Sequence, residues 1–268
     1  MTFIEVLQAI FMGAVEAVTE FLPVSSTGHL ILAGELIGFD GPPGHVFEIA
    51  IQLGAVLAVV VLYFKRLINV LLGLHNDPAA RRFELVGIVA FISAVIAGVL
   101  MYDTIKAYLF TPWIVCSMLI AGGIAILLIE KLHPEHSIHS IEEMPVKTAL
   151  MIGLVQCLAL IPGVSRSGAT IMGALSLGVD RKTAAEFSFF QAIPLLAGAA
   201  LYDLWKNRAH MDMDTMSIIG VGFISSFIFA LIVIKWMIGY VQRNGFGVFA
   251  WYRIVAGTLG LIILTLIP

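Results

Sequence analysis

Long apolar blocks, separated by short polar breaks, run through this sequence almost from end to end. A helix needs about 20 apolar residues to cross a bilayer. The third, fourth, fifth, eighth, ninth and tenth blocks meet that length, so the pattern predicts an all-α polytopic membrane protein. The ten blocks have rough limits at 3–20, 27–38, 43–64, 84–101, 111–130, 146–161, 167–178, 182–203, 216–242 and 248–267.

Two of the blocks, 27–38 and 167–178, are too short to span a bilayer. Each follows another apolar block after a break rich in proline, serine and glycine, which reads LPVSSTGHL at 22–30 and IPGVSRSGAT at 161–170. Irregular backbone at membrane depth is tolerated only where it is buried in protein or lines a wet cavity. The breaks therefore predict two re-entrant helix–loop–helix segments, each entering and leaving the bilayer on the same side.

The sequence also resembles itself at an offset of about 140 residues. Each half holds one re-entrant pair and three crossings, and because three is odd the second half starts from the opposite face. We expect an inverted-topology repeat of two five-helix halves within one membrane domain, 1–268, with repeats at about 1–130 and 146–268 and a cytoplasmic linker at about 131–145. The matched positions are Gly13 with Gly153, Glu16 with Gln156, Val24 with Val164, Ser25 with Ser165, and Gly28 with Gly168.

Lysine and arginine are concentrated on one side of the predicted crossings. Because positive residues favour the cytoplasmic side, we expect the richer side to be cytoplasmic and both termini to face outward. The richer side has Lys65, Arg66, Arg81, Arg82, Lys131, Lys147, Arg181, Lys182 and Arg243, and the other side has Lys106, Lys206 and Arg208.

The composition excludes an ordinary soluble domain. Hydrophobic residues make up 60% of the chain and charged residues 12%, against roughly 45–50% and 25% in soluble domains. The two cysteines, Cys116 and Cys157, lie in apolar stretches and are expected to be buried thiols without a disulfide. We expect the bilayer as the surroundings and no nucleic acid among the partners, and a homodimer is left open.

Two polar connectors, 75–82 and 131–145, are expected to be solvated loops. Their histidines invite a metal-site interpretation, but the spacing is loose and a proline at 134 interrupts any helix there. These histidines are His75, His133, His136 and His139.

Glu16 and Glu20 stand four residues apart and therefore share one face of the first helix. A charged side chain at the bilayer centre costs roughly 2.5–3.5 kcal/mol on insertion scales, so two of them require a reason. They could hold a divalent cation, act as a general base, or anchor a proton or sodium pathway. The alternative is that both sit near the outer interface and are merely hydrated.

The first loop offers an anion site and a nucleophile. A proline at 23 ends the first helix, and Ser25 or Ser26 is a good N-cap for the second. The free N–H groups at such a helix start favour an anion. Ser26 and His29 are three apart and can share a face, as a nucleophile and its base would. A capping serine and a packed histidine would explain the same pattern.

The second loop adds an arginine. Arg166 stands between Ser165 and Ser167 at another helix start, and Thr170 follows one turn later. An arginine at membrane depth needs an anion, and its forked donors suit phosphate. The alternative is an ion pair with one of the two glutamates that only locks the halves together. Two helix starts, one arginine and several hydroxyls favour a polyanion such as a diphosphate.

At these motifs the sequence resembles a known family. The stretches EAVTEFLPVSSTGHL at 16–30 and PGVSRSGAT at 162–170 are similar to the signature motifs of the undecaprenyl-diphosphate phosphatases, the bacitracin-resistance family. The resemblance covers essentially the whole chain, including FEIAIQLGAVLAVV at 47–60. It implies hydrolysis of undecaprenyl diphosphate to the monophosphate at the outer side of the bacterial cytoplasmic membrane, with a divalent cation such as Mg²⁺ or Ca²⁺.

The resemblance also implies roles for individual residues. Glu16 and Glu20 would hold the metal ion or position a proton acceptor. Ser26 would attack the terminal phosphate with His29 assisting, unless water attacks directly. The expected catalytic residues are Glu20, Ser26, His29 and Arg166. The expected substrate-binding residues are Ser165 and Thr170 from the family motif, the neighbouring hydroxyls of Ser25, Thr27 and Ser167, and Gln52 from an adjacent crossing.

Two rival classes remain to be weighed. A transporter or lipid flippase also uses inverted repeats with broken helices, but it gains nothing from a serine and histidine beside two carboxylates. The acid-phosphatase-like lipid phosphatases share serine–histidine and serine–arginine themes, but need a second histidine soon after the arginine. The stretch 167–178 contains no histidine, so that family is excluded.

Overall fold

The computed structural model describes residues 2–39, 41–42, 46–108, 111–132, 136–207 and 213–266, and their side chains except at 97–99, 101–108, 203–204, 206–207 and 213–214. Within this part of the chain every regular element is helical, apart from one isolated bridge, so the predicted all-α class is confirmed. The α-helices are α1 (Phe3–Phe21), α2 (Ser26–Ile37), α3 (Val46–Leu62), α4 (Phe64–Gly73), α5 (Pro78–Tyr108), α6 (Pro112–Leu132), α7 (Val146–Gln156), α8 (Arg166–Ser176), α9 (Arg181–Asn207), α10 (Met213–Asn244) and α11 (Gly247–Leu266), and a short 3-10 helix, η2, spans Cys157–Leu160.

The chain divides into two compact units. The first unit consists of Met1–Phe21, Ser26–Phe64 and Ala192–Trp236. The second unit consists of Leu22–Ser25, Lys65–Gln191 and Met237–Pro268. The short loop after α1 therefore belongs to the second unit, although the helices on either side of it belong to the first.

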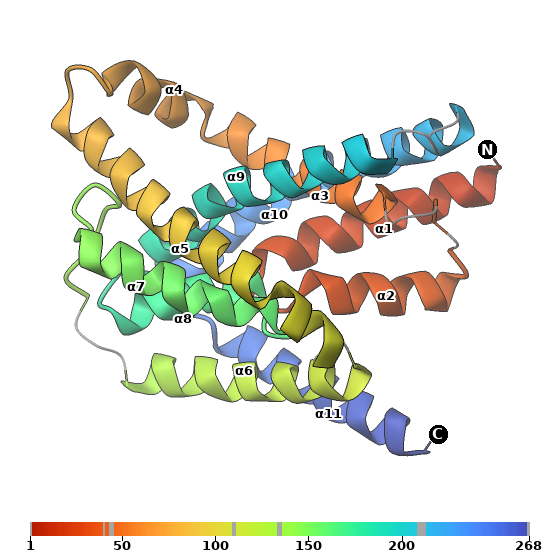
Figure 1. Cartoon of the computed structure of the whole chain (residues 1–268). Helices are drawn as coiled ribbons and strands as arrows, with labels where there is room; N and C mark the ends of the chain where they lie inside the picture. Colours follow the sequence, from red (N-terminus) through yellow and green to blue (C-terminus); the bar gives the residue numbers. More distant parts are fainter. Residues whose placement is uncertain are drawn as a thin grey trace. The chain divides into compact units, whose positions relative to one another are not determined.

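In the first unit, α1 packs against α2 and α3 (Figure 1). Met12 and Phe47 belong to its buried apolar cluster. Gly13 allows α1 to approach α10 closely, because a Cβ there would lie 2.5 Å from the carbonyl oxygen of Gly222 and 2.9 Å from the Cβ of Ser225. The Ser225 hydroxyl stabilises this contact between α1 and α10 by donating to a backbone carbonyl of α1 at 2.7 Å.

In the second unit, α5 packs against α7, α7 against α8, and α6 against α11 (Figure 1). Gly153 of α7 lies against α5, where a Cβ would meet the Ser93 hydroxyl and lie 2.5 Å from the carbonyl oxygen of Ala90. After Gln156 the α-helix tightens into η2, so the predicted helical block 146–161 is α-helical over only its first part.

Four helical segments of the described chain are long and apolar enough to cross a membrane. The consecutive helices α3 and α4, separated by a sharp bend, pass the same criterion only as a pair. The predicted crossing 84–101 lies within α5, partly beyond the described side chains, and stays a prediction. A multi-pass membrane protein is confirmed by the four segments, which are Pro112–Leu132, Arg181–Tyr202, Thr215–Asn244 and Gly247–Leu266.

The stretch between α3 and α5 is more helical than predicted. Helix α4 has no buried residue, and α5 begins at Pro78, inside the predicted loop 75–82. Asp77 caps this start, because its Oδ1 accepts the N–H of Ala79 at 2.9 Å, and proline suits a first helical position. The prediction of a loop is therefore wrong from Pro78 onward.

The linker 131–145 is a packed connection in its second part, which corrects the prediction of a solvated loop. Ile138, Ile141 and Met144 are buried, and Ile138 forms an isolated parallel bridge with Val179. Of the histidines predicted there, His139 is exposed, His136 is half-buried and His133 lies outside the described residues. Apolar residues at every third position hold this segment against its unit.

Candidate active site

A serine with unusual backbone geometry stands directly before each short helix. The φ angles are +74° at Ser25 and +76° at Ser165, a region that residues other than glycine rarely adopt. At Ser165 the side chain caps α8 by accepting the N–H of Gly168 at 3.1 Å. Such strain persists only where the surrounding structure enforces it, and it is concentrated at functional sites.

In the first unit, α1 carries two buried carboxylates. Glu16 is fully buried and Glu20 is 7% exposed, and their spacing of four residues places them one turn apart. The Ser26 hydroxyl, at the start of α2, donates to Oε2 of Glu20 at 2.6 Å. His29, one turn further along α2, is half-buried. The proton of the predicted nucleophile therefore points at Glu20 rather than at His29.

In the second unit, polar side chains of α8 hold one another and their neighbours. Nη1 of Arg166 donates to the carbonyl of Ser188 at 2.7 Å and approaches its hydroxyl at 3.2 Å. Thr170, fully buried, donates to Oε1 of Gln156 at 2.7 Å and lies 2.9 Å from the carbonyl of Arg166. The hydroxyls of Ser165 and Ser167 are 3.1 Å apart. The guanidinium of Arg166 is thus fixed from one side by α9.

The two loops that follow α1 and η2 lie together within this second unit. The Ser167 hydroxyl donates to the carbonyl of Leu22 at 2.9 Å. A buried arginine, Arg253 of α11, contacts both loops as well. Its Nη1 donates to the carbonyls of Pro23 at 2.8 Å and of Val164 at 3.0 Å. The loop residues 22–25 and 163–167, which are far apart in the sequence, therefore lie together within the second unit.

Arg253 is the main residue that sequence reasoning missed. It belongs to neither motif and has no counterpart at the repeat offset, but it is 1% exposed within an apolar helix. A charged residue within an apolar helix is a candidate functional residue, so the sequence did contain a signal for Arg253. Gln156, also buried, was noticed only as the repeat partner of Glu16.

Two predicted substrate-binding residues remain, one on α2 and one on α3. Thr27 is exposed on the first turn of α2, and Gln52 is half-buried on α3. No described hydrogen bond connects either of them to the predicted catalytic residues of their unit. Their assignment to substrate binding stays a prediction.

The two glutamates fit one kind of metal site. The described residues contain no group of three or more His, Cys, Asp or Glu side chains that could hold a metal ion. Mg²⁺, however, is usually bound through one or two carboxylates plus substrate phosphates and waters. Glu16 and Glu20, buried on one face of α1, supply such a pair. The donor set therefore suits a cation shared with a phosphate substrate.

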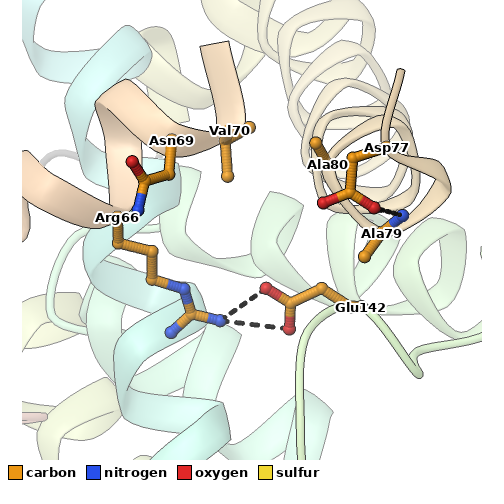
Figure 2. Close-up of a pocket in the computed structure, with 7 residues that line it drawn as sticks. All are labelled: Arg66, Asn69, Val70, Asp77, Ala79, Ala80 and Glu142. Atoms are coloured by element: carbon orange, nitrogen blue, oxygen red, sulfur yellow. Dashed lines mark hydrogen bonds and ion pairs between the residues drawn. The ribbon is translucent and has the colours of Figure 1, made fainter. Parts of the chain in front are cut away.

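A surface hollow of about 360 Å³ in the second unit contains none of the predicted site residues. Figure 2 shows one nitrogen of the Arg66 guanidinium bonded to both carboxylate oxygens of Glu142. This nitrogen, Nη2, donates to Oε1 at 2.9 Å and to Oε2 at 3.1 Å. Arg66 also pairs with Glu186 at 2.9 Å and lies over the rings of Phe83 and Phe190. These contacts tie α4 to the linker and to α9, and they indicate a structural role.

Comparison with known proteins agrees with the motifs. The family model of the bacitracin resistance protein BacA matches residues 9–259. A protein of Parvibaculum lavamentivorans named undecaprenyl-diphosphatase is 55% identical over 260 residues, covering 97% of each chain. Proteins of the same name from Rhizorhabdus wittichii and Rhodopseudomonas palustris strain BisA53 are 55% and 52% identical, covering 96% and 98% of each chain. The chain therefore belongs to the bacitracin resistance protein BacA family.

Proposed function

We propose that this chain hydrolyses undecaprenyl diphosphate to undecaprenyl phosphate and inorganic phosphate, and so recycles the lipid carrier used in cell-wall synthesis. The name of its close relatives supports this reaction. The observation that carries it is the buried 2.6 Å hydrogen bond from Ser26 to Glu20, because it joins a hydroxyl nucleophile to a proton acceptor. Resistance to bacitracin follows from the same activity.

The diphosphate is held by positive and N–H groups of the two loops. Arg166 offers the planar fork that suits phosphate oxygens, and Ser188 fixes its orientation. The helix starts at Ser26 and Arg166 direct N–H groups and the positive dipole end toward an anion. These groups stabilise the charge on the transferring phosphoryl group and require no reorganisation during the reaction. The Ser167–Leu22 hydrogen bond supports the proximity of the two loops within the second unit.

The chemical step begins at Ser26. Glu20 removes the hydroxyl proton as the serine oxygen forms a bond to the terminal phosphorus. The bond from that phosphorus to the bridging oxygen breaks, and the lipid monophosphate leaves as an anion. Glu20 passes the captured proton to the departing monophosphate and is a free carboxylate again. Water then attacks the phosphoserine while Glu20 accepts its proton. That proton returns to the serine oxygen as the bond from this oxygen to phosphorus breaks, and inorganic phosphate is released. His29, half-buried on the same helix as Ser26, is assigned to orienting the phosphate rather than to taking the first proton.

Glu16 and Glu20 would hold a divalent cation, Mg²⁺ or Ca²⁺, together with phosphate oxygens of the substrate. Such a cation neutralises charge on the phosphates when bound. Two buried carboxylates one turn apart are otherwise difficult to accommodate in an apolar helix.

The fold is proposed to be an inverted repeat, with residues 1–130 and 146–268 as its halves. The positive φ angles at Ser25 and Ser165 occur at the offset of the repeat. Gly13 packs on Gly222 and Ser225 in one unit, as Gly153 packs on Ala90 and Ser93 in the other. The last helices of the two halves, α6 and α11, pack together. These features therefore occur at equivalent places in the two halves.

The inverted repeat leads to an orientation in the cytoplasmic membrane. The lysine and arginine distribution places the linker 131–145 inside and both termini outside. The family resemblance implies action on the outer side of this membrane, so the site is proposed to open outward. Cysteine labelling of the linker and of a terminus with an impermeant reagent on intact cells tests this orientation, and labelling of the linker alone would contradict it.

A flippase is the less favoured function, because lipid transport has no use for a serine held on a buried carboxylate. The deciding experiment measures phosphate release from a polyprenyl diphosphate by the purified protein in detergent with Mg²⁺ or Ca²⁺. We expect one phosphate per lipid, loss of release on chelation, and loss in Arg166→Ala. No release by the wild-type protein with metal present, together with lipid movement in vesicles, would favour transport.

A further inference from the structure

The guanidinium of Arg253 uses all its donors on backbone carbonyls. Nη1 binds Pro23 and Val164, and Nη2 binds Gly163 at 2.9 Å and Met118 at 3.1 Å. Nε donates to Leu119 at 3.3 Å. Three of these five acceptors belong to the two strained loops, and the other two belong to α6. One side chain from the end of the sequence therefore connects both loops to α6.

The positive charge of Arg253 has no carboxylate beside it in the described part of the chain, although the side chain is only 1% exposed. Burying a charge without a counterion is strongly unfavourable unless its hydrogen bonds are complete. The five carbonyl bonds provide that compensation, but they leave the net charge in place. Stability alone would be served better by an apolar residue, so the arrangement indicates a second purpose.

The surroundings of Arg253 are shaped for a guanidinium. A Cβ at Gly122 would overlap Nη2, and a Cβ at Gly168 would lie 3.3 Å from Nη1. Gly168 belongs to the first turn of α8, whose N–H is capped by the strained Ser165. Gly168 therefore leaves room for the arginine and also forms part of the capped start of α8.

The bonds to Arg253 also orient the peptide groups of the loops. In a trans peptide the C=O and N–H point in opposite directions. Because the carbonyl of Val164 faces Arg253, the N–H of Ser165 faces away from it, at the start of α8. The guanidinium therefore fixes the direction of a donor that precedes Arg166 by one residue.

We propose that Arg253 is a positioning residue for the diphosphate. It holds the loops 22–25 and 163–165 in their strained conformations and places an unneutralised positive charge behind the anion. This role rests on the proposed phosphatase function, since it presumes that the loops bind a diphosphate. Arg253 itself touches neither the substrate nor the reacting atoms.

The test compares Arg253→Lys, which keeps the charge but loses the fork, with Arg253→Gln, which loses the charge. Arg181→Gln is the control, because Arg181 is a partly buried guanidinium, forked onto Glu130 at 2.8 and 3.0 Å, and makes no described bond to either loop. All three proteins are assayed well below their melting temperatures. We expect kcat/KM to fall about 100-fold in Arg253→Gln and about tenfold in Arg253→Lys, mainly through kcat, as misplacement by about 1 Å would cause. The control should stay within about threefold of the wild type.

Hydrogen exchange on the same proteins gives a readout that does not depend on activity. Peptides covering 22–27 and 163–168 should exchange faster, and together, in both Arg253 variants but not in Arg181→Gln. Activity of Arg253→Gln within about threefold of the wild type, or unchanged exchange in one of the two peptides, would overturn the proposal. A wild-type protein that releases no phosphate would instead contradict the proposed function. The exchange result would still decide whether Arg253 holds the two loops in place.

Discussion

Replacing Glu20 by glutamine removes the carboxylate that accepts the Ser26 hydroxyl, but keeps the length of the side chain and one acceptor oxygen. The bond of 2.6 Å lies in the range of charge-assisted O–H···O⁻ bonds. Such a bond contributes roughly 1.5–3 kcal/mol, and a neutral one about 0.5–1.5 kcal/mol. The free energy of unfolding should therefore fall by only about 1 kcal/mol, and relief from burying a charge offsets part of that.

The rate of phosphate release should change far more than the free energy of unfolding. A positioned general base contributes about 10²–10⁴-fold to the rate, which corresponds to roughly 2.7–5.5 kcal/mol of activation free energy. We expect kcat for phosphate release to fall by that factor in Glu20→Gln. Ser26→Ala should be at least as inactive, because the nucleophile is gone.

The double variant shows whether the two side chains act as one unit. If Glu20 serves only to activate Ser26, combining both changes should cost no more than Ser26→Ala alone. The assay is phosphate release at saturating lipid with metal present. Losses that multiply, or near-normal activity of Ser26→Ala, would refute the reasoning.

Ser226→Ala is the control for losing a buried serine in the same unit. Ser226 is fully buried and donates to the carbonyl of Ile51 at 2.7 Å. Its removal should lower the free energy of unfolding by about 1 kcal/mol. Because that bond joins α10 to α3 and involves none of the predicted catalytic residues, kcat should stay within about threefold of the wild type.

Three further changes address the arginine fork, the helix contacts and the linker. Arg166→Lys should lower kcat/KM about 100-fold or more, since one ammonium cannot replace a fork on phosphate. A kcat/KM within tenfold of the wild type would contradict this. Ser188→Ala should lower kcat/KM less, because the bond from Arg166 to the Ser188 carbonyl remains. Gly153→Ala should destabilise by about 1–3 kcal/mol through overlap with α5, whereas Gly239→Ala, with open space around it, should not lower the melting temperature. Arg66→Ala should cost about 1–3 kcal/mol by breaking two partly exposed ion pairs, and an unchanged thermal melt would rule out its structural role.

Most helices could be predicted because their apolar blocks are long and their breaks contain proline or glycine. α4 could not, because it follows α3 at once and its ten residues are amphipathic rather than apolar. The start of α5 had a readable signal in Asp77 followed by Pro78, which is an N-cap before a favoured first residue. In the linker, Ile138, Ile141 and Met144 look like isolated apolar residues until the packing around them is known.

The candidate site was predictable where the chemistry is local in sequence. Proline, serine and a carboxylate pair near one helix break indicate a site without knowledge of the fold. The partner of Ser26 was not predictable, since His29 and Glu20 lie within reach along the chain and only the folded structure selects Glu20. Arg253 depends on contacts between segments more than eighty residues apart, which no local pattern reveals.

The stereochemical course at the transferred phosphorus tests the central claim most directly. A polyprenyl diphosphate made chiral at its terminal phosphorus with sulfur and oxygen isotopes is hydrolysed by the wild-type protein, and the configuration of the released thiophosphate is determined. Two successive in-line displacements through phosphorylated Ser26 predict retention of configuration. Inversion would mean a single attack by water and would contradict the role given to Ser26.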